Sequence, residues 1–394
     1  MLRIDRVQTF GLKIPHHDNF GGLASHPEAF VGGEYYFEKH WNEVYSTSTR
    51  ALLVRVEASD GTYGWGEPQA PIAPEVAQQV IDRLLGPMLI GCDPTQVNRH
   101  WERMYKSMNV RGQTSGFMLD AIAGLDAALW DIAGKVSGAP VSAMLGGAVR
   151  TTLPAYVSGL RGRSWDEQVE YALKHLQQGY AAIKLYLGEG LQNDIAHAQA
   201  IRSGIGTDRR LLTDWLWGYG LVEGTRLGRE MEDLGVEWVE TPLAVEDREG
   251  HARLADALTV AVAAGECMRT RYQFLDWFNA AALDVAQPDV ARCGITEAKR
   301  IADIALSFHR PVAFHLGLSM GVSMAATWHV ASSLPNFYIQ EAHPPMIALS
   351  NEFLLEPLQV EHGELVVPTG PGLGVDVDIK ALEPWISSRG EVSR

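Results

Sequence analysis

Three short apolar runs, AAIKLY (181–186), RLLTDW (210–215) and VEWVETP (236–242), decide the fold of this 394-residue chain. Amphipathic stretches with apolar residues three and four apart lie between them, which is typical of surface helices. Strands that alternate with helices favour a parallel sheet. Further apolar runs continue the alternation on both sides: LPAYVSGL (153–160), VAVAAGE (260–266), LDVAQPD (283–289), PVAFHL (311–316) and FYIQEA (337–342). Eight strands with seven intervening helices indicate a parallel β/α barrel of the (β/α)7β type, because no clear helix follows the eighth strand.

The residues before the barrel mix strand and helix patterns. Residues 2–13 alternate as a strand does, and 51–67 predict two strands joined at the hairpin signal Asp60-Gly61. Helical stretches follow near 74–90 and 95–108, and a third, dense in Ala and Leu, ends at Gly138. We therefore predict an α+β capping domain.

We divide the chain into three parts. Residues 1–130 form the cap, residues 131–345 form the barrel, and residues 346–394 form a C-terminal segment. Within that segment ELVVP and PGLGVDVD are extended, and we expect them to return to the cap.

Composition excludes several classes of protein. The chain is 46% hydrophobic and 21% charged, with no apolar run of membrane-spanning length and no signal peptide at its start. Its three cysteines lie far apart without a CxxC pair, so neither a disulfide framework nor a zinc ribbon is expected. A net charge of −15 argues against nucleic acid and anionic membranes as partners. We expect a cytoplasmic enzyme.

Ionisable residues recur at the predicted carboxyl ends of the strands, where barrel active sites lie. They are Lys184 and Tyr186, Asp214, Glu240, Glu266, Asp289, His315 and Glu341. From Tyr186 onward they are 28, 26, 26, 23, 26 and 26 residues apart, which is the length of one strand–helix unit. Side chains two apart share a face of a strand, so Lys184 and Tyr186 can both point inward.

Three consecutive strands end in the carboxylates Asp214, Glu240 and Glu266. Their mutual repulsion calls for a cation, and ligation by oxygen alone favours Mg²⁺. The other possibility for each acid is a salt bridge or a strand-end cap.

Asp289 and His315 lie on the next two strand ends. A carboxylate that accepts a hydrogen bond from one imidazole nitrogen orients the ring and raises its pKa, which leaves the other nitrogen as a base. This pair is therefore the predicted catalytic dyad.

The combination resembles the enolase superfamily, in its mandelate racemase subgroup, over nearly the whole chain. The segment Asp126-Ala127-Ala128-Leu129-Trp130-Asp131 and the closing Pro371-Gly372-Leu373-Gly374 are similar to that family's sequences. The resemblance implies Mg²⁺ ligation by Asp214, Glu240 and Glu266, the dyad of Asp289 and His315, and a hydrogen bond from Glu341 to the substrate's developing enolate. It also implies abstraction of the proton α to a carboxylate, and a symmetric homo-oligomer.

Three departures from the family pattern bear on the reaction. The second strand reads Lys184-Leu185-Tyr186 where the family commonly has two lysines; the third is followed by Trp215-Leu216, and the fourth reads Glu240-Thr241-Pro242. Tyrosine has an ordinary pKa near 10 and is a poor base, although a neighbouring Lys184 would lower that pKa. We expect Lys184 to contact the substrate carboxylate or Tyr186.

One base and one acid suffice for a dehydratase, with His315 and Tyr186 in these roles. We therefore predict a lyase of carbohydrate catabolism that dehydrates a sugar acid, an aldonate or an aldarate, to a 2-keto-3-deoxy acid. The alternatives are a racemase, epimerase or lactone cycloisomerase acting on a related acid. From another class, the alternative is a metal-binding pseudoenzyme.

The loop between His16 and Tyr45 is unusually long for a connection between two strands. Loops longer than about 12–15 residues are often lids or binding loops. The resemblance implies that it covers the barrel mouth, and we expect Trp41 and Tyr45 to bind the substrate. An oligomer contact is the alternative, and both roles can hold together.

Overall fold

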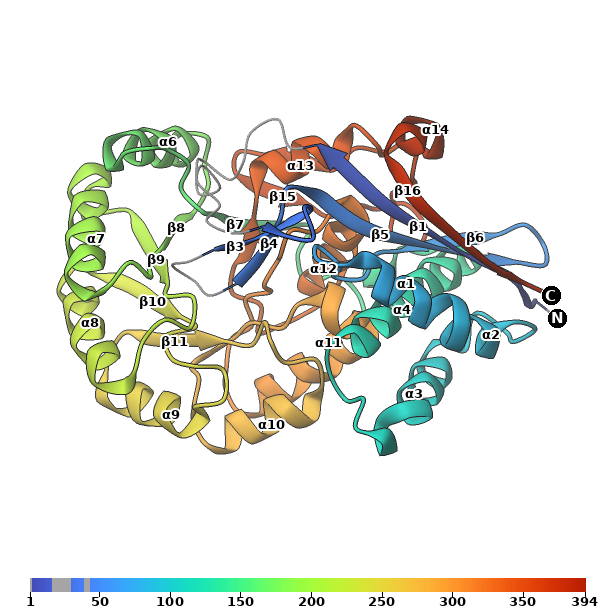
Figure 1. Ribbon diagram of the computed structural model, residues 1–394, viewed down its shortest axis with the longest axis horizontal. Coiled ribbons are helices and arrows are strands. Elements are labelled where there is room, and N and C mark those ends of the chain that lie inside the picture. The colour runs from blue at the N-terminus through green and yellow to red at the C-terminus, as the bar shows by residue number, and fades with distance from the viewer. Residues whose placement is uncertain (1, 16–29, 39–42) are drawn as a thin grey trace.

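The structure is a computed structural model that describes residues 2–15, 30–38 and 43–394. Figure 1 shows a barrel beside a cap in which the N- and C-terminal strands lie next to each other. Trp41, a predicted substrate-binding residue, falls outside the described residues.

The barrel occupies residues 152–342, all of which the structure describes. Its hydrogen-bonded strands are β7 (Thr152–Ser158), β8 (Ala182–Tyr186), β9 (Arg210–Asp214), β10 (Val236–Glu240), β11 (Ala261–Ala264), β12 (Val285–Ala286) and β13 (Gln340–Ala342). They pair in parallel in chain order, and β13 returns to pair with β7. The seventh predicted strand, 311–316, makes single bridges from Val312 to Ala286 and Phe337, which closes the ring. The predicted parallel barrel is confirmed.

Helices alternate with these strands around the outside of the barrel (Figure 1). They are α6 (Trp165–Gln177), α7 (Leu191–Ile205), α8 (Leu221–Asp233), α9 (Arg248–Ala257), α10 (Arg271–Asn279), α11 (Val290–Ser307) and α12 (Gly321–Ser332). The expectation that no helix follows the eighth strand is wrong, because α13 (Pro344–Asn351) begins there. Two prolines occupy its first turn, where their missing N–H groups cost nothing, and its short sequence hides the helical period.

The cap is built on an antiparallel sheet with the strand order β16-β1-β5-β6 among the described residues. These strands are β1 (Ile4–Pro15), β5 (Ser48–Ala58), β6 (Tyr63–Gly66) and β16 (Ile386–Ser393). The predicted hairpin joins β5 to β6, with Gly61 at a φ of +88°. The sheet carries α1 (Pro74–Val80), α2 (Gly86–Leu89), α3 (Val97–Met108) and α4 (Phe117–Ser137), and α5 (Val141–Met144) leads into the barrel.

The long helix α4 joins the cap to the barrel through two buried carboxylates. Asp126 accepts hydrogen bonds from the backbone and hydroxyl of Thr296 in α11, at 2.9 and 2.6 Å. Asp131 accepts bonds from the backbone N–H groups of Trp65 and Leu373. The helix runs through the proposed division at residue 130, so that division cuts a continuous packing unit.

The C-terminal segment visits both parts of the molecule. Strand β16 pairs with β1, next to the N-terminus (Figure 1). The ELVVP stretch does not return to the cap: β15 (Glu364–Val366) pairs with β14 (Gln359–Glu361) and with β7 of the barrel. A short α14 (Ile379–Leu382) precedes β16. Pairing with the N-terminal end of β7 extends the barrel sheet there.

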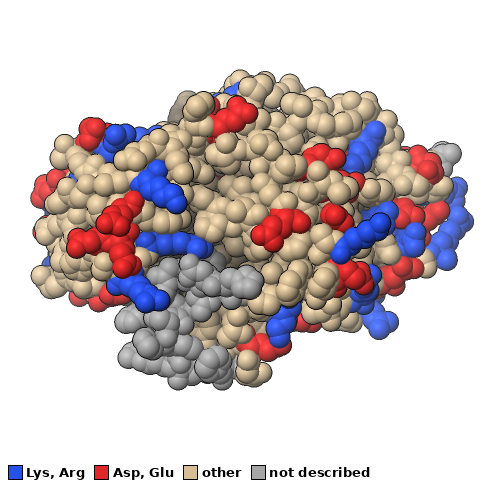
Figure 2. Space-filling model, turned by 90° about the horizontal axis from the view of Figure 1, so that it is seen from above, with Lys and Arg blue, Asp and Glu red and all other residues tan. Residues whose placement is uncertain are grey.

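A three-stranded antiparallel sheet stands between β1 and β5 in the chain. Its described strands are β2 (Phe30–Val31), β3 (Tyr35–Glu38) and β4 (Glu43–Ser46). Figure 2 shows acidic and basic side chains interspersed over one face of the molecule, so the net charge is not gathered there into one patch. No helix within the described residues is long and apolar enough to cross a membrane.

Candidate active site

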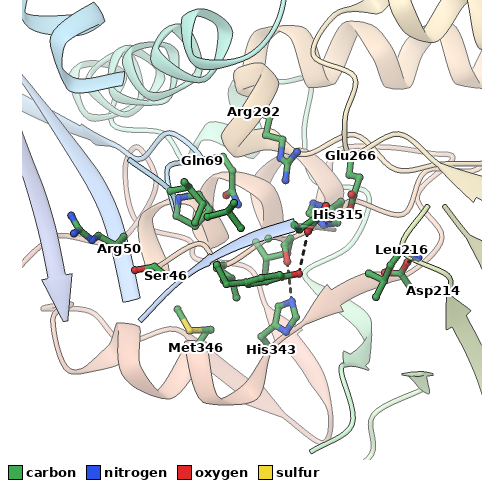
Figure 3. A pocket seen from close by; sticks show the side chains of 18 of the residues that line it. Ser46, Arg50, Gln69, Asp214, Leu216, Glu266, Arg292, His315, His343 and Met346 are labelled. Carbon is green, nitrogen blue, oxygen red and sulfur yellow. Dashed lines mark hydrogen bonds and ion pairs between the residues drawn. The ribbon is translucent and has the colours of Figure 1, made fainter. Parts of the chain in front are cut away.

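A cavity of about 390 Å³ lies between the carboxyl ends of the barrel strands and the strand β4 (Figure 3). Seven of the residues predicted from the sequence line it: Tyr45, Lys184, Tyr186, Asp214, Glu266, His315 and Glu341. Its volume suits a small organic ligand. The ends of the strands are therefore brought together as the sequence predicts, and the β2–β4 sheet covers them.

Backbone register places the acidic residues side by side. Tyr186 is paired with Asp214, and Asp214 with Glu240, on adjacent parallel strands. Glu266 follows the end of β11, which is the next strand. Asp214 and Glu240 are 4% and 1% exposed, so their charges are removed from water.

Lys184 is the counter-ion of this acidic cluster. Its Nζ lies 2.6 Å from Glu240, 2.8 Å from Glu341 and 3.5 Å from Asp214. Burial by itself would lower the pKa of Lys184, but the carboxylates outweigh burial and raise that pKa well above its ordinary value. Lys184 therefore stays charged and is no base.

Glu240 is held from two sides. Lys184 donates to one of its oxygens and Gln287 donates to the other, at 2.7 Å. Burial nevertheless raises the pKa of Glu240 to about 8, since Asp214 and Glu341 add negative charge nearby. The cluster therefore holds more carboxyl groups than one lysine neutralises, and Glu240 tends to keep a proton.

The predicted dyad is formed. His315 Nδ1 lies 2.8 Å from Asp289 Oδ2, and the other oxygen of Asp289 accepts the backbone N–H of Ala291. Asp289 thus caps the start of α11 and fixes the imidazole ring with one carboxylate. The other ring nitrogen, Nε2, lies 2.8 Å from Glu266 Oε2.

The contact with Glu266 sets the charge on the histidine. Burial favours neutral His315, but the charge of Glu266 and the hydrogen bonds to Asp289 and Glu266 raise the pKa of His315 well above 6.5. His315 in turn outweighs the burial of Glu266 and lowers the pKa of that carboxyl. In this arrangement the two side chains form an ion pair.

Among the described residues, no three His, Cys, Asp or Glu side chains are arranged to hold a metal ion. The reason is visible in the ion pairs, because Glu240 is turned to Lys184 and Glu266 to His315. Asp214 accepts hydrogen bonds from the Thr241 hydroxyl and the Leu216 backbone instead. The unusual Thr of the Glu-Thr-Pro sequence thus orients Asp214.

Tyr186 faces the cavity from the end of β8, with its hydroxyl 2.9 Å from Ser158 Oγ. Lys184 does lower the pKa of Tyr186, as expected, but it does not decide the outcome. Burial is the larger influence and raises the pKa of Tyr186 above 10. Its hydroxyl therefore keeps its proton at neutral pH and can donate a hydrogen bond or a proton.

Glu341, at the end of β13, joins two elements of the site. One of its oxygens contacts Lys184 and the other accepts the backbone N–H of Leu316 at 2.7 Å. Burial favours protonation of Glu341, but Lys184 and His315 lower its pKa to about 2. A charged Glu341 accepts hydrogen bonds and does not donate them.

The strand β4 brings two side chains over the barrel mouth. Tyr45 donates a hydrogen bond of 3.1 Å to Glu43, and both line the cavity. Burial and the charge of Glu266 raise the pKa of Glu43. The long loop thus contributes to the cavity at Tyr45, as expected.

Sequence reasoning missed Glu43, Gln287 and Arg292. Gln287 lies two residues before Asp289 on the same strand, so the rule of alternating faces could have found it. Arg292 lies in the first turn of α11, where no periodic signal marks it, yet its side chain points into the cavity (Figure 3). Glu43 is placed by a hairpin whose pairing the sequence does not reveal.

Comparisons with known proteins agree with this architecture. Residues 167–381 match the enolase C-terminal domain-like family, and residues 42–146 match the mandelate racemase/muconate lactonizing enzyme N-terminal domain. The D-galactarolactone cycloisomerase of Agrobacterium fabrum is 33% identical over 84% of this chain and 90% of its own. The arabinonate dehydratase of Saccharolobus solfataricus is 30% identical over 92% of both chains.

A solved structure of a putative isomerase from Sinorhizobium meliloti, in an open-loop conformation, is 31% identical. It superposes with a TM-score of 0.92 over 100% of both chains. The chain therefore belongs to the enolase superfamily, in the mandelate racemase/muconate lactonizing enzyme family.

Proposed function

We propose that this protein is a hydro-lyase that dehydrates a sugar acid, an aldonate or an aldarate, to a 2-keto-3-deoxy acid. The observation that carries the proposal is the dyad: His315 Nε2 faces the cavity while Asp289 holds Nδ1 at 2.8 Å. A proton donor, Tyr186, lies in the same cavity. The arabinonate dehydratase among its relatives supports a sugar acid as the substrate.

We also propose Mg²⁺ as the cofactor, held by Asp214, Glu240 and Glu266. The donor chemistry fits a hard divalent cation, since three carboxyl groups follow consecutive strands and Lys184 is too little charge to neutralise them all. When bound, the ion would stabilise negative charge that develops on the substrate carboxylate.

His315 takes the proton from the carbon α to the carboxylate. The nitrogen that receives it is the one that Glu266 contacts, so the reaction requires that contact to open and Nε2 to release its proton to solvent before the substrate's α-proton is taken. The same nitrogen can then return the proton to the leaving hydroxyl, which gives a syn elimination with one acid–base residue. Asp289 keeps the ring oriented through both steps.

Lys184 and Tyr186, on strand β8, contribute further groups to the same cavity. Lys184 lines the cavity, and its charge supports binding of the substrate carboxylate. Tyr186 donates a hydrogen bond to the substrate and Glu341 accepts one from it. Because Glu341 is charged, it accepts hydrogen bonds from the substrate's hydroxyl groups, and donating one to a developing enolate would require it first to take up a proton.

A lactone cycloisomerase is the second candidate. It is supported by the D-galactarolactone cycloisomerase among the relatives, and it needs the same α-proton abstraction. A racemase or epimerase needs a base on each face of the carbon, and the raised pKa of Tyr186 argues against a second base. A pseudoenzyme would bind the metal and leave every acid unchanged.

The experiment is a screen of sugar acids and their lactones with Mg²⁺ in deuterated water, followed by mass spectrometry. Loss of one water, with the product trapped as a 2-keto acid, establishes the dehydratase. Isomerisation of a lactone to an open keto acid of equal mass would establish the cycloisomerase, and a one-dalton gain in unconsumed acid an epimerase. Chelation with EDTA should abolish turnover and added Mg²⁺ should restore it; turnover that survives chelation would overturn the metal proposal.

A homo-oligomer and a cytoplasmic location stay predictions. Light scattering coupled to size-exclusion chromatography tests the oligomer, and fractionation of cells tests the location.

A further inference from the structure

Arg292 is a charged side chain of the cavity that the proposed mechanism does not use. It lies in the first turn of α11, three residues after Asp289, and its side chain is 19% exposed. Figure 3 shows its guanidinium pointing into the cavity between Gln69 and Glu266. A positive group therefore stands on the same side of the cavity as the dyad.

The guanidinium is short of acceptors. Its Nε lies 3.5 Å from Asp289 Oδ2, beyond good hydrogen-bond geometry, and is buried without a hydrogen-bond partner. Across residues 2–15, 30–38 and 43–394, no acceptor receives a hydrogen bond from this side chain. By contrast, Arg50, which also lines the cavity, donates to Glu34 and Glu75. Leaving charged N–H groups without acceptors is costly, so a ligand is the natural acceptor for Arg292.

We propose, resting on the function proposed above, that Arg292 contacts the substrate and binds the oxygen that leaves from the carbon β to the carboxylate. Arg292 Nε and His315 Nδ1 both contact Asp289 Oδ2, and the charge of Arg292 also acts on Glu266, which contacts His315 Nε2. A substrate whose α-carbon meets His315 Nε2 presents the leaving oxygen of a syn elimination on that same side. The guanidinium is thus placed where negative charge develops as the bond to oxygen breaks.

The step balances without any further reactant. The α C–H bond breaks and its proton goes to His315, while the electron pair forms the carbon–carbon double bond. The β C–O bond breaks, its pair stays on the oxygen, and His315 returns the proton so that water leaves. Arg292 donates hydrogen bonds throughout and keeps its protons, since a guanidinium is not deprotonated near neutral pH.

The test separates proton abstraction from elimination. We expect Arg292→Gln to lower water loss at least about 100-fold, the effect of losing one charge-stabilising donor. The same variant should still exchange the α-proton, so deuterium should accumulate in unconsumed acid. Arg292→Lys, which keeps the charge beside Asp289, should show the same split. Arg300→Gln, on the same helix but paired with Glu102 and Glu297, is the control and should behave as the unmodified protein.

Two results would overturn the inference. Exchange and elimination that fall together, in both Arg292 variants, would mean that Arg292 acts only by positioning Asp289 and His315. Water loss that is unchanged would mean that it makes no contact with the leaving oxygen. Failure of the proposed function is a separate outcome, because the unmodified protein would then neither exchange nor dehydrate any acid in the screen.

Discussion

Two layers of side chains fill the barrel, and they differ in chemistry although both are buried. The inner layer is an apolar cluster: Tyr156, Ala182, Leu212, Trp238, Ala263, Val285, Ala313 and Ile339. Two residues further along the same strands stand the groups of the upper layer: Ser158, Lys184, Asp214, Glu240, Gln287, His315 and Glu341. The fifth strand has Gly265 at this level, and Glu266 follows it.

The difference shows how one scaffold serves stability and chemistry. A two-residue step keeps the side chain pointing into the barrel, so position alone decides which layer it joins. Trp238 is 0% exposed and Glu240 is 1% exposed. Burial of the apolar Trp238 side chain stabilises the fold. Burial of the Glu240 carboxyl costs free energy unless other side chains pair with it. The inner layer is thus an apolar core directly below the polar upper layer.

The largest effect should come from the upper layer, in the variant His315→Asn. We expect turnover to fall about 1,000-fold or more, because Asn cannot accept the α-proton. Steady-state kinetics measures the loss, and thermal unfolding checks that the fold is kept. Retained activity would remove His315 from the mechanism.

The matching change in the inner layer is Trp238→Ala. We expect the free energy of unfolding to fall by about 3–5 kcal/mol, since a large side chain is removed from a closed core. Urea denaturation measures this change. Val222→Ala, at a residue that is 68% exposed, is the control and should stay within about 0.5 kcal/mol. A loss of stability as small as the control's would show that the inner layer is not tightly packed.

Tyr186→Phe tests whether a hydroxyl of the upper layer takes part in the chemistry. We expect the rate of elimination to fall about 100-fold, because a hydrogen-bond donor to the substrate is lost while the ring still packs. The free energy of unfolding should change little, because Tyr186 lines the cavity and its ring still packs in the variant. An unchanged rate would return Tyr186 to the packing residues.

The smallest effect should come from the tyrosine of the inner layer. The hydroxyl of Tyr156 is buried without a hydrogen-bond partner among the described residues. Tyr156→Phe should therefore change the free energy of unfolding by less than about 1 kcal/mol, and in the stabilising direction. Urea denaturation beside Tyr186→Phe gives the comparison. A loss above about 2 kcal/mol would show that the hydroxyl has an acceptor.

Much of this arrangement could be predicted from the sequence. The alternation of strands and helices identifies the barrel, and the step of about one strand–helix unit picks out residues from Lys184 to Glu341. These features are local and periodic, so they are visible without contacts. The short helix α13 was missed because eight residues that begin with two prolines carry too little periodicity.

The sequence does not reveal which partners set the pKa of each ionisable side chain in the site. Lys184 precedes Tyr186 by two residues, and from that spacing it was expected to lower the tyrosine's pKa. In the fold Lys184 does lower that pKa, but Lys184 also pairs with Glu240 and Glu341, and burial of Tyr186 has the larger effect. Local spacing names neighbours along the chain, whereas electrostatics depends on every charge within a few ångströms.

The sequence by itself determined the strand order, the residue types at the strand ends and the pairing of Asp289 with His315, because the barrel repeats a local pattern. The tertiary structure alone decided that Glu266 meets His315, that Glu43 reaches over the cavity and that Arg292 points into it with its Nε unpaired among the described residues. Those contacts join residues from separate parts of the chain or depend on the direction of one side chain. The closed barrel and the strands that cover it fix these contacts and that direction.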